Sequence, residues 1–303
     1  MSRDRKPTKK QRRADVVANA FDAAMLKRVC ETDDFAQWAD RVELPAGRFY
    51  WYRDNGARVL AVAHLDTVQG DRSCRVVDSA AGLLAVSGAL DDRLGAYVIL
   101  ELLPRLGITC DVLLTTDEER GQSTAYEFAQ DFAEDGKPYD WIIEFDRGGT
   151  DVVMYQYETP GLVAMVESVG ARVGDGSYSD IADLESLGCA AFNWGVGYAD
   201  YHSPRAHAWL TDTFRMVARY VDFHNVYAGQ RLEHVPDRRD SWLDRDAWIP
   251  RDASDDDEYW VTGDCGHSVD LGDEQNYREV GADAEYVVCV VCAADPYQQG
   301  MTT

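Results

Sequence analysis

Two adjacent carboxylates, Asp91 and Asp92, stand between a short apolar run, Leu83 to Val86, and a strongly apolar helical pattern from Leu94 to Leu106. A carboxylate pair between a strand and a buried helix indicates either a helix cap or a metal site. Strand, acid pair and helix must therefore meet at one point of the fold.

Other residues of metal-ligand type follow similar apolar runs. They are His64, Glu118 and Glu119, Asp146, and His202 in a loop rich in Gly and Tyr. Most of these motifs have an ordinary explanation when taken alone. His64 can be a structural histidine, Asp91-Asp92 a helix N-cap, Glu118-Glu119 a solvated helix start and His202 a turn residue. Their joint occurrence at strand ends favours a metal site.

Hydrophobic periodicity predicts strands alternating with helices. The expected strands span 49–52, 59–64, 74–77, 83–86, 111–115, 141–145, 151–157 and 189–196. The expected helices span 14–30, 33–42, 92–106, 123–132, 161–169, 181–187 and 209–227. Asn55-Gly56 predicts a hairpin between the first two strands.

This alternation predicts an α/β fold with a mostly parallel sheet between two layers of helices. In such sheets the ligand crevice lies beyond the carboxyl ends of the strands. His64, Glu118, Glu119 and Asp146 all fall at such ends, so we expect their side chains to converge.

Two divalent ions close together need a shared anionic bridge, and Asp91 is the best candidate for it. Imidazole and carboxylate ligands suit zinc. Asp66 lies two residues after His64, so it can reach the second ring nitrogen of His64 and fix the tautomer of the imidazole. Glu118, beside the ligand Glu119, is placed to act as a general base.

Four motifs resemble those of a known family. They are Val62-Ala63-His64-Leu65-Asp66-Thr67-Val68, Gly88-Ala89-Leu90-Asp91-Asp92-Arg93-Leu94-Gly95, Thr116-Asp117-Glu118-Glu119-Arg120-Gly121 and His202-Ser203-Pro204-Arg205. Together with Asp146, residues 57–228 resemble the co-catalytic zinc exopeptidases. These are aminopeptidases, carboxypeptidases and related deacylases with a phosphorylase/hydrolase-like α/β fold.

The resemblance implies one metal ion on His64, Asp91 and Asp146, and another on Asp91, Glu119 and His202. It also implies a cis peptide bond between Asp91 and Asp92. The implied reaction is metal-assisted hydrolysis of an amide or peptide bond, in which Glu118 accepts a proton from a water that bridges the metals. Two zinc ions are the implied cofactors, although other divalent metals suit such ligands.

Many members of this family insert a lid or dimerisation domain between the last two ligands. Only 55 residues lie between Asp146 and His202, so the chain resembles the single-domain aminopeptidases. We expect a peptide or small amide as substrate, with N-terminal or C-terminal specificity and the oligomeric state left open. Tyr198, Ser179 and Asp180 lie in loops near the expected mouth and are candidate substrate contacts.

The C-terminal region contains a second group of metal-ligand residues. Cys265 and His267 precede Cys289 and Cys292 by 21 residues, a spacing that suits a tetrahedral structural zinc. The pattern resembles a zinc ribbon, with Cys-x-His in place of the first Cys-x-x-Cys. A module this small needs metal binding to fold.

We therefore expect four parts: a basic tail at 1–13, a di-metal hydrolase domain at 14–230, a linker at 231–258 and a zinc-ribbon-like module at 259–295. The tail contains seven Lys and Arg residues. It is expected to be a disordered solvated segment or an arm that contacts nucleic acid or the protein's own acidic surface.

Composition limits the partners and the compartment. The formal net charge is -24, with 54 acidic against 30 basic residues, so the body of the protein repels nucleic acid. No run of 18 apolar residues and no secretory signal are visible, and the seven cysteines are scattered. We expect a cytoplasmic protein with reduced thiols and no membrane partner.

Two other functions compete with hydrolysis of an amide. The chain can be an inactive, peptidase-like adaptor that binds partners through its zinc ribbon, although retention of Glu118 argues against this. A dinuclear phosphoesterase is disfavoured, because the extra histidines and basic groups that phosphate requires are missing.

The acidic composition yields a first testable expectation. Adaptation to high salt predicts that the thermal midpoint of unfolding rises by at least roughly 10 °C from about 0.1 M to about 3 M KCl, because salt screens the repulsion among surface carboxylates. Scanning calorimetry over this range measures it. A nearly normal midpoint in dilute buffer would instead indicate compositional drift.

Overall fold

The computed structural model describes residues 9–79 and 82–235, together with the four short strands 260–262, 268–270, 277–280 and 286–289. The chain divides into two compact units, Met1–Asp240 and Ser241–Thr303. No helix among the described residues is long and apolar enough to cross a membrane.

The first unit is built on a seven-stranded sheet. Its strand order is β1 (Asp40–Glu43), β2 (Phe49–Arg53), β6 (Asp111–Thr115), β3 (Val59–His64), β7 (Trp141–Glu144), β9 (Ala191–Trp194) and β8 (Val152–Val153). The four central strands, from β6 to β9, are parallel, and the outer strands are antiparallel. The predicted α/β fold with a mostly parallel core is therefore confirmed.

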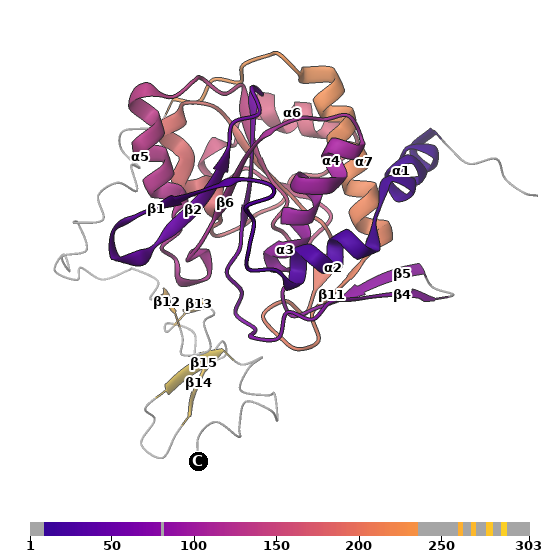
Figure 1. Ribbon diagram of the computed structural model, residues 1–303, viewed down its shortest axis with the longest axis vertical. Helices are drawn as coiled ribbons and strands as arrows, with labels where there is room; N and C mark the ends of the chain where they lie inside the picture. The colour runs from indigo at the N-terminus through magenta and orange to yellow at the C-terminus, as the bar shows by residue number, and fades with distance from the viewer. Residues whose placement is uncertain are drawn as a thin grey trace, which may run out of the picture. The chain divides into compact units, whose positions relative to one another are not determined.

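Helices cover both faces of this sheet (Figure 1). One face packs against α5 (Ala125–Asp135) and the 3-10 segment Asp180–Leu187. The other packs against α3 (Leu90–Tyr97), the π-helical segment Val98–Leu102 that continues it, and α7 (Leu210–Tyr227). The short α4 (Leu103–Arg105) follows that segment, and α1 (Lys9–Ala20) and α2 (Ala23–Glu31) lie outside α7 and α3. Helix α6 (Pro160–Ser168) completes the unit. Because both faces are covered, every residue of β3 is buried.

Large aromatic side chains fill the space on each side of the sheet. On the α5 side, Phe128 contacts Tyr50 and Tyr52. On the α7 side, Phe223 contacts rings of β7 and β9, those of Trp141, Phe192 and Trp194. These contacts fix the two helical layers against the sheet.

A second, antiparallel sheet lies beside the first. Its order is β10 (Tyr198–Ala199), β11 (His207–Trp209), β5 (Gly82–Val86) and β4 (Arg75–Ser79). Strand β5 leads directly into the acid pair at the start of α3, and the loop between β10 and β11 contains His202. This sheet therefore connects two distant ligand-type residues.

Several sequence expectations were wrong in detail. Asn55-Gly56 does not form a hairpin, because β6 lies between β2 and β3. The backbone N–H groups of Asn55 and Ala57 donate to the carboxylate of Asp111, which directs the loop around the start of β6. The strand expected at 151–157 is reduced to β8 and a 3-10 turn, Tyr155–Tyr157.

The N-terminal expectations also need correction. The helix expected at 14–30 begins at Lys9, inside the basic stretch expected to be a tail, and is interrupted at Asp22. The Asp22 carboxylate accepts the N–H groups of Ala24 and Met25 and so starts a new helix. The helix expected at 33–42 is instead a turn followed by β1.

The domain ends later than expected. Leu232, inside the expected linker, is buried, and its N–H donates to the carbonyl of Asp140. The Arg231 guanidinium donates to the carbonyls of Tyr139 and Gly188. These contacts place residues 231–235 with the first unit.

Arg93 joins three segments in the interior of the first unit. The residue is 2% exposed, and its guanidinium donates to the carbonyls of Leu65, Val29 and Thr32. We expect Arg93→Ala to lower the free energy of unfolding by about 3–4 kcal/mol, because it leaves these carbonyls without a donor. Urea unfolding measures the loss.

The matched control for this substitution is Arg105→Ala. Arg105 forms ion pairs with Asp22 and Glu101, but its side chain is 39% exposed. We expect a cost below about 1 kcal/mol, since water replaces an exposed partner. Equal losses in the two variants would contradict a special role for Arg93.

Candidate metal centre

His64 is the last residue of β3 and is fully buried. Its Nδ1 lies 3.0 Å from the carbonyl oxygen of Asp66 and 3.6 Å from the Asp66 carboxylate. A carbonyl only accepts, so Nδ1 bears the hydrogen and Nε2 is directed at the site. Asp66 thus orients the ring as expected, but through its backbone more closely than through its side chain.

Asp91 lies between two imidazoles. Its Oδ1 is 3.0 Å from Nε2 of His64, and its Oδ2 is 3.1 Å from Nε2 of His202. Both side chains reach it from other elements, His64 from β3 and His202 from the loop after β10. The peptide bond between Asp91 and Asp92 is cis, as the resemblance implies.

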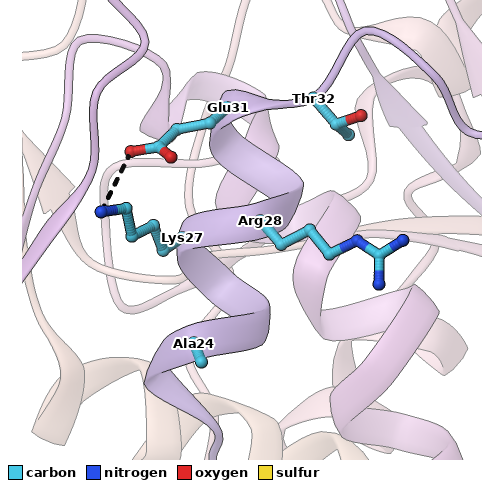
Figure 2. A pocket seen from close by; sticks show the side chains of 5 residues that line it. All are labelled: Ala24, Lys27, Arg28, Glu31 and Thr32. Carbon is cyan, nitrogen blue, oxygen red and sulfur yellow. Dashed lines mark ion pairs between the residues drawn. The ribbon is translucent and has the colours of Figure 1, made fainter.

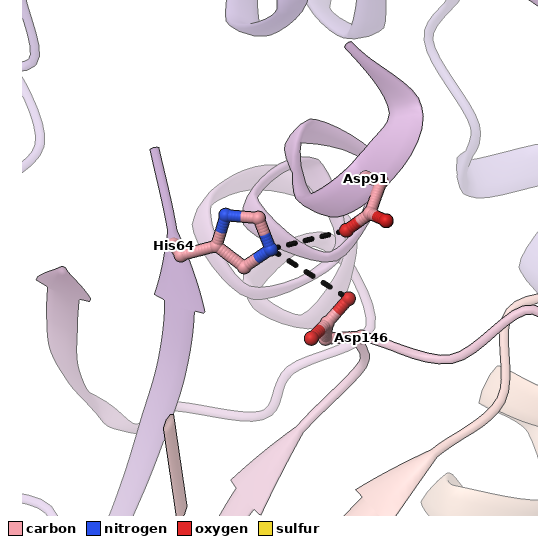
Figure 3. A group of neighbouring side chains, drawn as sticks. All are labelled: His64, Asp91 and Asp146. Carbon is pink, nitrogen blue, oxygen red and sulfur yellow. Dashed lines mark hydrogen bonds and ion pairs between the residues drawn. The ribbon is translucent and has the colours of Figure 1, made fainter. Parts of the chain in front are cut away.

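The ligand-type side chains form two groups that share Asp91. One consists of His64, Asp91 and Asp146, and Figure 3 shows these three side chains converging. The other consists of Asp91, Glu119 and His202. Within each group the ligand atoms lie within 4.8 Å of one another. The structure thus brings together all five residues singled out in the sequence, in the division that the resemblance implies.

Glu118 and Glu119 begin a 3-10 turn, Glu118–Arg120, after β6. Their backbone N–H groups donate to the two carboxylate oxygens of Asp66, at 3.3 and 3.1 Å. Oε2 of Glu119 lies 2.9 Å from Nε2 of His202, and Oε2 of Glu118 lies 3.8 Å from Nε2 of His64. The carboxylate of Asp66 therefore holds the turn from which both glutamates reach the site.

His202 has a left-handed backbone, with φ 58°. Its carbonyl accepts a hydrogen bond of 2.8 Å from the side-chain amide of Gln69. This contact joins the loop after β10 to the loop after β3. The bond therefore limits the movement of the most exposed ligand, whose side chain is 35% exposed.

Asp146 follows β7 and is fixed by two neighbours. Its backbone N–H and carbonyl both bond to the side-chain amide of Asn193, at 3.0 and 2.7 Å. Its Oδ1 accepts a hydrogen bond of 2.6 Å from the hydroxyl of Tyr198. The sequence analysis did not select Asn193, although a lone amide within the apolar strand β9 was a usable signal.

Burial and mutual repulsion act on the carboxylates of the site. Burial, assisted by neighbouring carboxylates, raises the pKa of Glu118 to about 9 and that of Asp146 to about 8. Burial alone would lower the pKa of His202, but hydrogen bonds to Asp91 and Glu119 outweigh it and raise the pKa to about 10. For Asp91, burial is outweighed by its bonds to His202 and His64, which lower its pKa.

These residues fit divalent metal ions. Within the described ranges, the four acids Asp91, Glu118, Glu119 and Asp146 have no Lys or Arg in ion-pair contact, only the two imidazoles. Oε1 of Glu119 is buried without a hydrogen-bond partner. Nitrogen and oxygen ligands in groups of three match what zinc accepts, with a position left open for water.

Two of the candidate substrate contacts are in the wrong place for that role. Ser179 and Asp180 are fully buried; Ser179 donates to Glu144, and Asp180 accepts from Thr115 and Ser123. Their side chains thus form hydrogen bonds inside the protein and do not reach the surface. Tyr198 is also buried, at 4% exposure, and contacts Asp146.

A surface hollow of about 390 Å³ lies elsewhere, along α2. It is lined by Ala24, Lys27, Arg28, Glu31 and Thr32 (Figure 2). Lys27 and Glu31 form an ion pair of 3.8 Å across one turn of the helix. None of the ligand-type residues borders this hollow, and its chemistry is that of a solvated helix face.

Comparison with solved structures tests the fold. No family model matches the chain, and no curated protein matches its sequence. A tripeptidase from Staphylococcus aureus is similar with a TM-score of 0.50 and 10% identity, over 72% of this chain and 99% of that one.

Two further solved structures are similar at lower scores. One is the aminopeptidase PepT from Bacillus cereus, at a TM-score of 0.47 and 11% identity, over 69% of this chain and 98% of that one. The other is a Zn-dependent exopeptidase from Parabacteroides distasonis, at 0.42 and 16%, over 71% and 88%. The chain thus has the α/β fold of the tripeptidase structure, in agreement with the resemblance of its motifs to the co-catalytic zinc exopeptidases.

Proposed function

We propose that the chain is a di-metal hydrolase that cleaves an amide or peptide bond. Within that class we propose an exopeptidase of the aminopeptidase type. The observation on which this depends is the position of Asp91, which belongs to both ligand groups: its Oδ1 lies next to His64 and its Oδ2 next to His202. A shared carboxylate is what a pair of metal ions requires. The tripeptidase with the same fold supports a small peptide as substrate.

Two divalent ions at these ligands would supply Lewis acidity and lower the pKa of water. The chain's own residues would do the rest. Oε2 of Glu118 would accept a proton from the attacking water and later pass it to the leaving amine. Burial and neighbouring carboxylates raise the pKa of Glu118 in the absence of metal. Positive charge at the ligands would lower it again and leave the carboxylate free to accept the proton.

Asp66, Tyr198 and Asn193 would position these groups. Asp66 orients the ring of His64 and holds the turn of Glu118 and Glu119. Tyr198 and Asn193 fix the side chain and the backbone of Asp146. Such contacts set the direction of ligand lone pairs and the basicity of ligand atoms.

We also propose that Cys265, His267, Cys289 and Cys292 bind one structural zinc ion. Cys265, His267 and Cys292 lie outside the described residues, and only the backbone of Cys289 is described. The support comes from the strands around them. In the second unit, β12 (Trp260–Thr262) pairs with β13 (Ser268–Asp270), and β14 (Tyr277–Val280) pairs with β15 (Tyr286–Cys289). Each expected ligand pair thus borders a strand pair, as in a zinc ribbon.

Activity provides the main test. We expect the zinc-loaded protein to hydrolyse chromogenic amino-acid anilides or tripeptides, to lose this activity with a chelator and to regain it with zinc. Glu118→Gln should lower kcat by about 10³-fold, because it removes the proton acceptor. Metal content, measured by elemental analysis, should stay unchanged in this variant.

A matched control is Glu158→Gln, which changes an exposed glutamate that is not among the ligand groups. It should keep wild-type activity. If wild type and Glu118→Gln are equally inert on a broad amide panel while both bind metal, the hydrolase proposal fails. An inactive adaptor would then be the better explanation.

Metal content provides an independent test. We expect about three zinc equivalents per chain, two in the hydrolase domain and one in the C-terminal module. Replacing both Cys289 and Cys292 by Ser should remove only one equivalent, because the first unit contains its own ligands. Loss of all three would show that the two metal sites depend on each other.

A further inference from the structure

The segment between β6 and α5, residues 116–124, contains both glutamates of the site. Its ends bond to each other: the N–H of Thr124 donates to the carbonyl of Thr116, and the N–H of Thr116 donates to the hydroxyl of Thr124, both at 3.0 Å. The segment is therefore a closed loop with the turn Glu118–Arg120 at its tip. Asp66 holds this turn on the side that faces the ligands.

Arg48 holds the same loop by other groups. Its Nε donates to Oδ2 of Asp117 at 3.2 Å, and its Nη2 donates to the carbonyl of Gln122. Its Nη1 pairs with the carboxylate of Glu127 on α5. Each of the three guanidinium nitrogens thus has a different partner, and two of these partners flank the turn that presents the glutamates.

The backbone around Arg48 is itself fixed. A tight turn, Pro45–Gly47, precedes it, with Gly47 at φ 77°, and the carbonyl of Arg48 accepts the N–H of Leu44 at 2.9 Å. The carbonyl of the next residue, Phe49, accepts the hydroxyl of Thr116 at 2.8 Å. Arg48 is therefore held in place by the start of β2 and does not merely extend from a loose loop.

We propose that Arg48 is a positioning residue for the proposed reaction. By holding Asp117 and Gln122, it fixes the turn that places Glu118 and Glu119 at the metal centre. Arg48 contacts neither glutamate side chain and is not a ligand. The inference rests on the proposed function, since it assigns Arg48 a part in that same site.

An arginine is required here because of its shape. The planar guanidinium offers donors in fixed directions, so it reaches three partners at once, whereas a lysine ammonium can replace only some of them. Asp117 has a left-handed backbone, with φ 65°, and its side chain pairs with Arg48. The ion pair therefore holds the residue that directly precedes Glu118.

The test compares Arg48→Ala and Arg48→Lys with wild type, all loaded with zinc. Misplacement of the glutamates should lower kcat about 100-fold in Arg48→Ala with KM within about threefold of wild type. The weaker of the two zinc affinities of the first unit, measured by competition with a chromophoric chelator, should fall about 10-fold. Arg48→Lys should recover part of both losses.

The matched control is Arg58→Ala. Arg58 donates from Nε and Nη2 to Oδ1 of Asp140, at 3.1 and 2.7 Å, next to the starts of β3 and β7. That position is at the opposite end of these strands from the ligands. Arg58→Ala should lower the thermal midpoint of unfolding, because it removes an ion pair that stabilises the fold. It should leave kcat and zinc affinity within about twofold of wild type, because that ion pair holds no part of the metal centre.

Asp117→Asn is the second variant, for use if Arg48→Ala does not fold. It removes the charge that Arg48 holds, and Asn accepts a left-handed backbone as readily as Asp does. It should lower kcat and zinc affinity in the same direction. Folded Arg48 and Asp117 variants with wild-type kcat and zinc affinity would overturn the proposal.

Zinc affinity separates this proposal from the proposed function. A wild-type protein that binds two zinc ions in its first unit but hydrolyses no amide refutes the hydrolase. The affinity change in Arg48→Ala still tests whether Arg48 positions Glu119. If the wild type hydrolyses no amide, wild-type zinc affinity in that variant would refute the positioning role.

Discussion

Repulsion among buried carboxylates is the constraint on which the first unit depends. Asp91, Glu118, Glu119 and Asp146 lie at one edge of the sheet. Within the described ranges two imidazoles, and no Lys or Arg, are in ion-pair contact with them. Such a group is stable only if positive charge enters it. Without metal, protons on the histidines would supply some of that charge. Divalent ions at the two ligand groups would replace those protons and supply it more fully.

The fold concentrates these acids by a simple means. Parallel strands end at one edge, so residues that follow β3, β6 and β7 become neighbours although they are far apart in the sequence. Apolar side chains on both faces fix the strands, and the acids occupy the first positions that are free of that packing. Asp66 then holds Glu118 and Glu119 by hydrogen bonds, and Asn193 and Tyr198 hold Asp146. Arg48 bonds to Asp117 and Gln122, which flank the turn of the two glutamates.

The sequence predicts the centre of this arrangement better than its surroundings. His64, Asp91, Glu119, Asp146 and His202 can be selected because each has a metal-ligand side chain at the end of a recognisable pattern. The Asn55-Gly56 hairpin failed because local turn chemistry does not determine which strand becomes the neighbour. Arg48 could not be selected, since its partners are tertiary contacts with residues about 70 positions away. Ser179 and Asp180 were misplaced because a polar segment can be buried when neighbouring hydroxyls satisfy it.

The small antiparallel sheet determines how far apart the acid pair and the loop of His202 lie. Strand β11 pairs with β5 in a fixed register, His207 opposite Val86, just before β5 enters the acid pair and just after the loop of His202. The spacing between these two segments is therefore set by one short ladder of backbone hydrogen bonds. Surface loops outside these two segments can therefore differ in length without changing that spacing, as long as the ladder between β11 and β5 is kept.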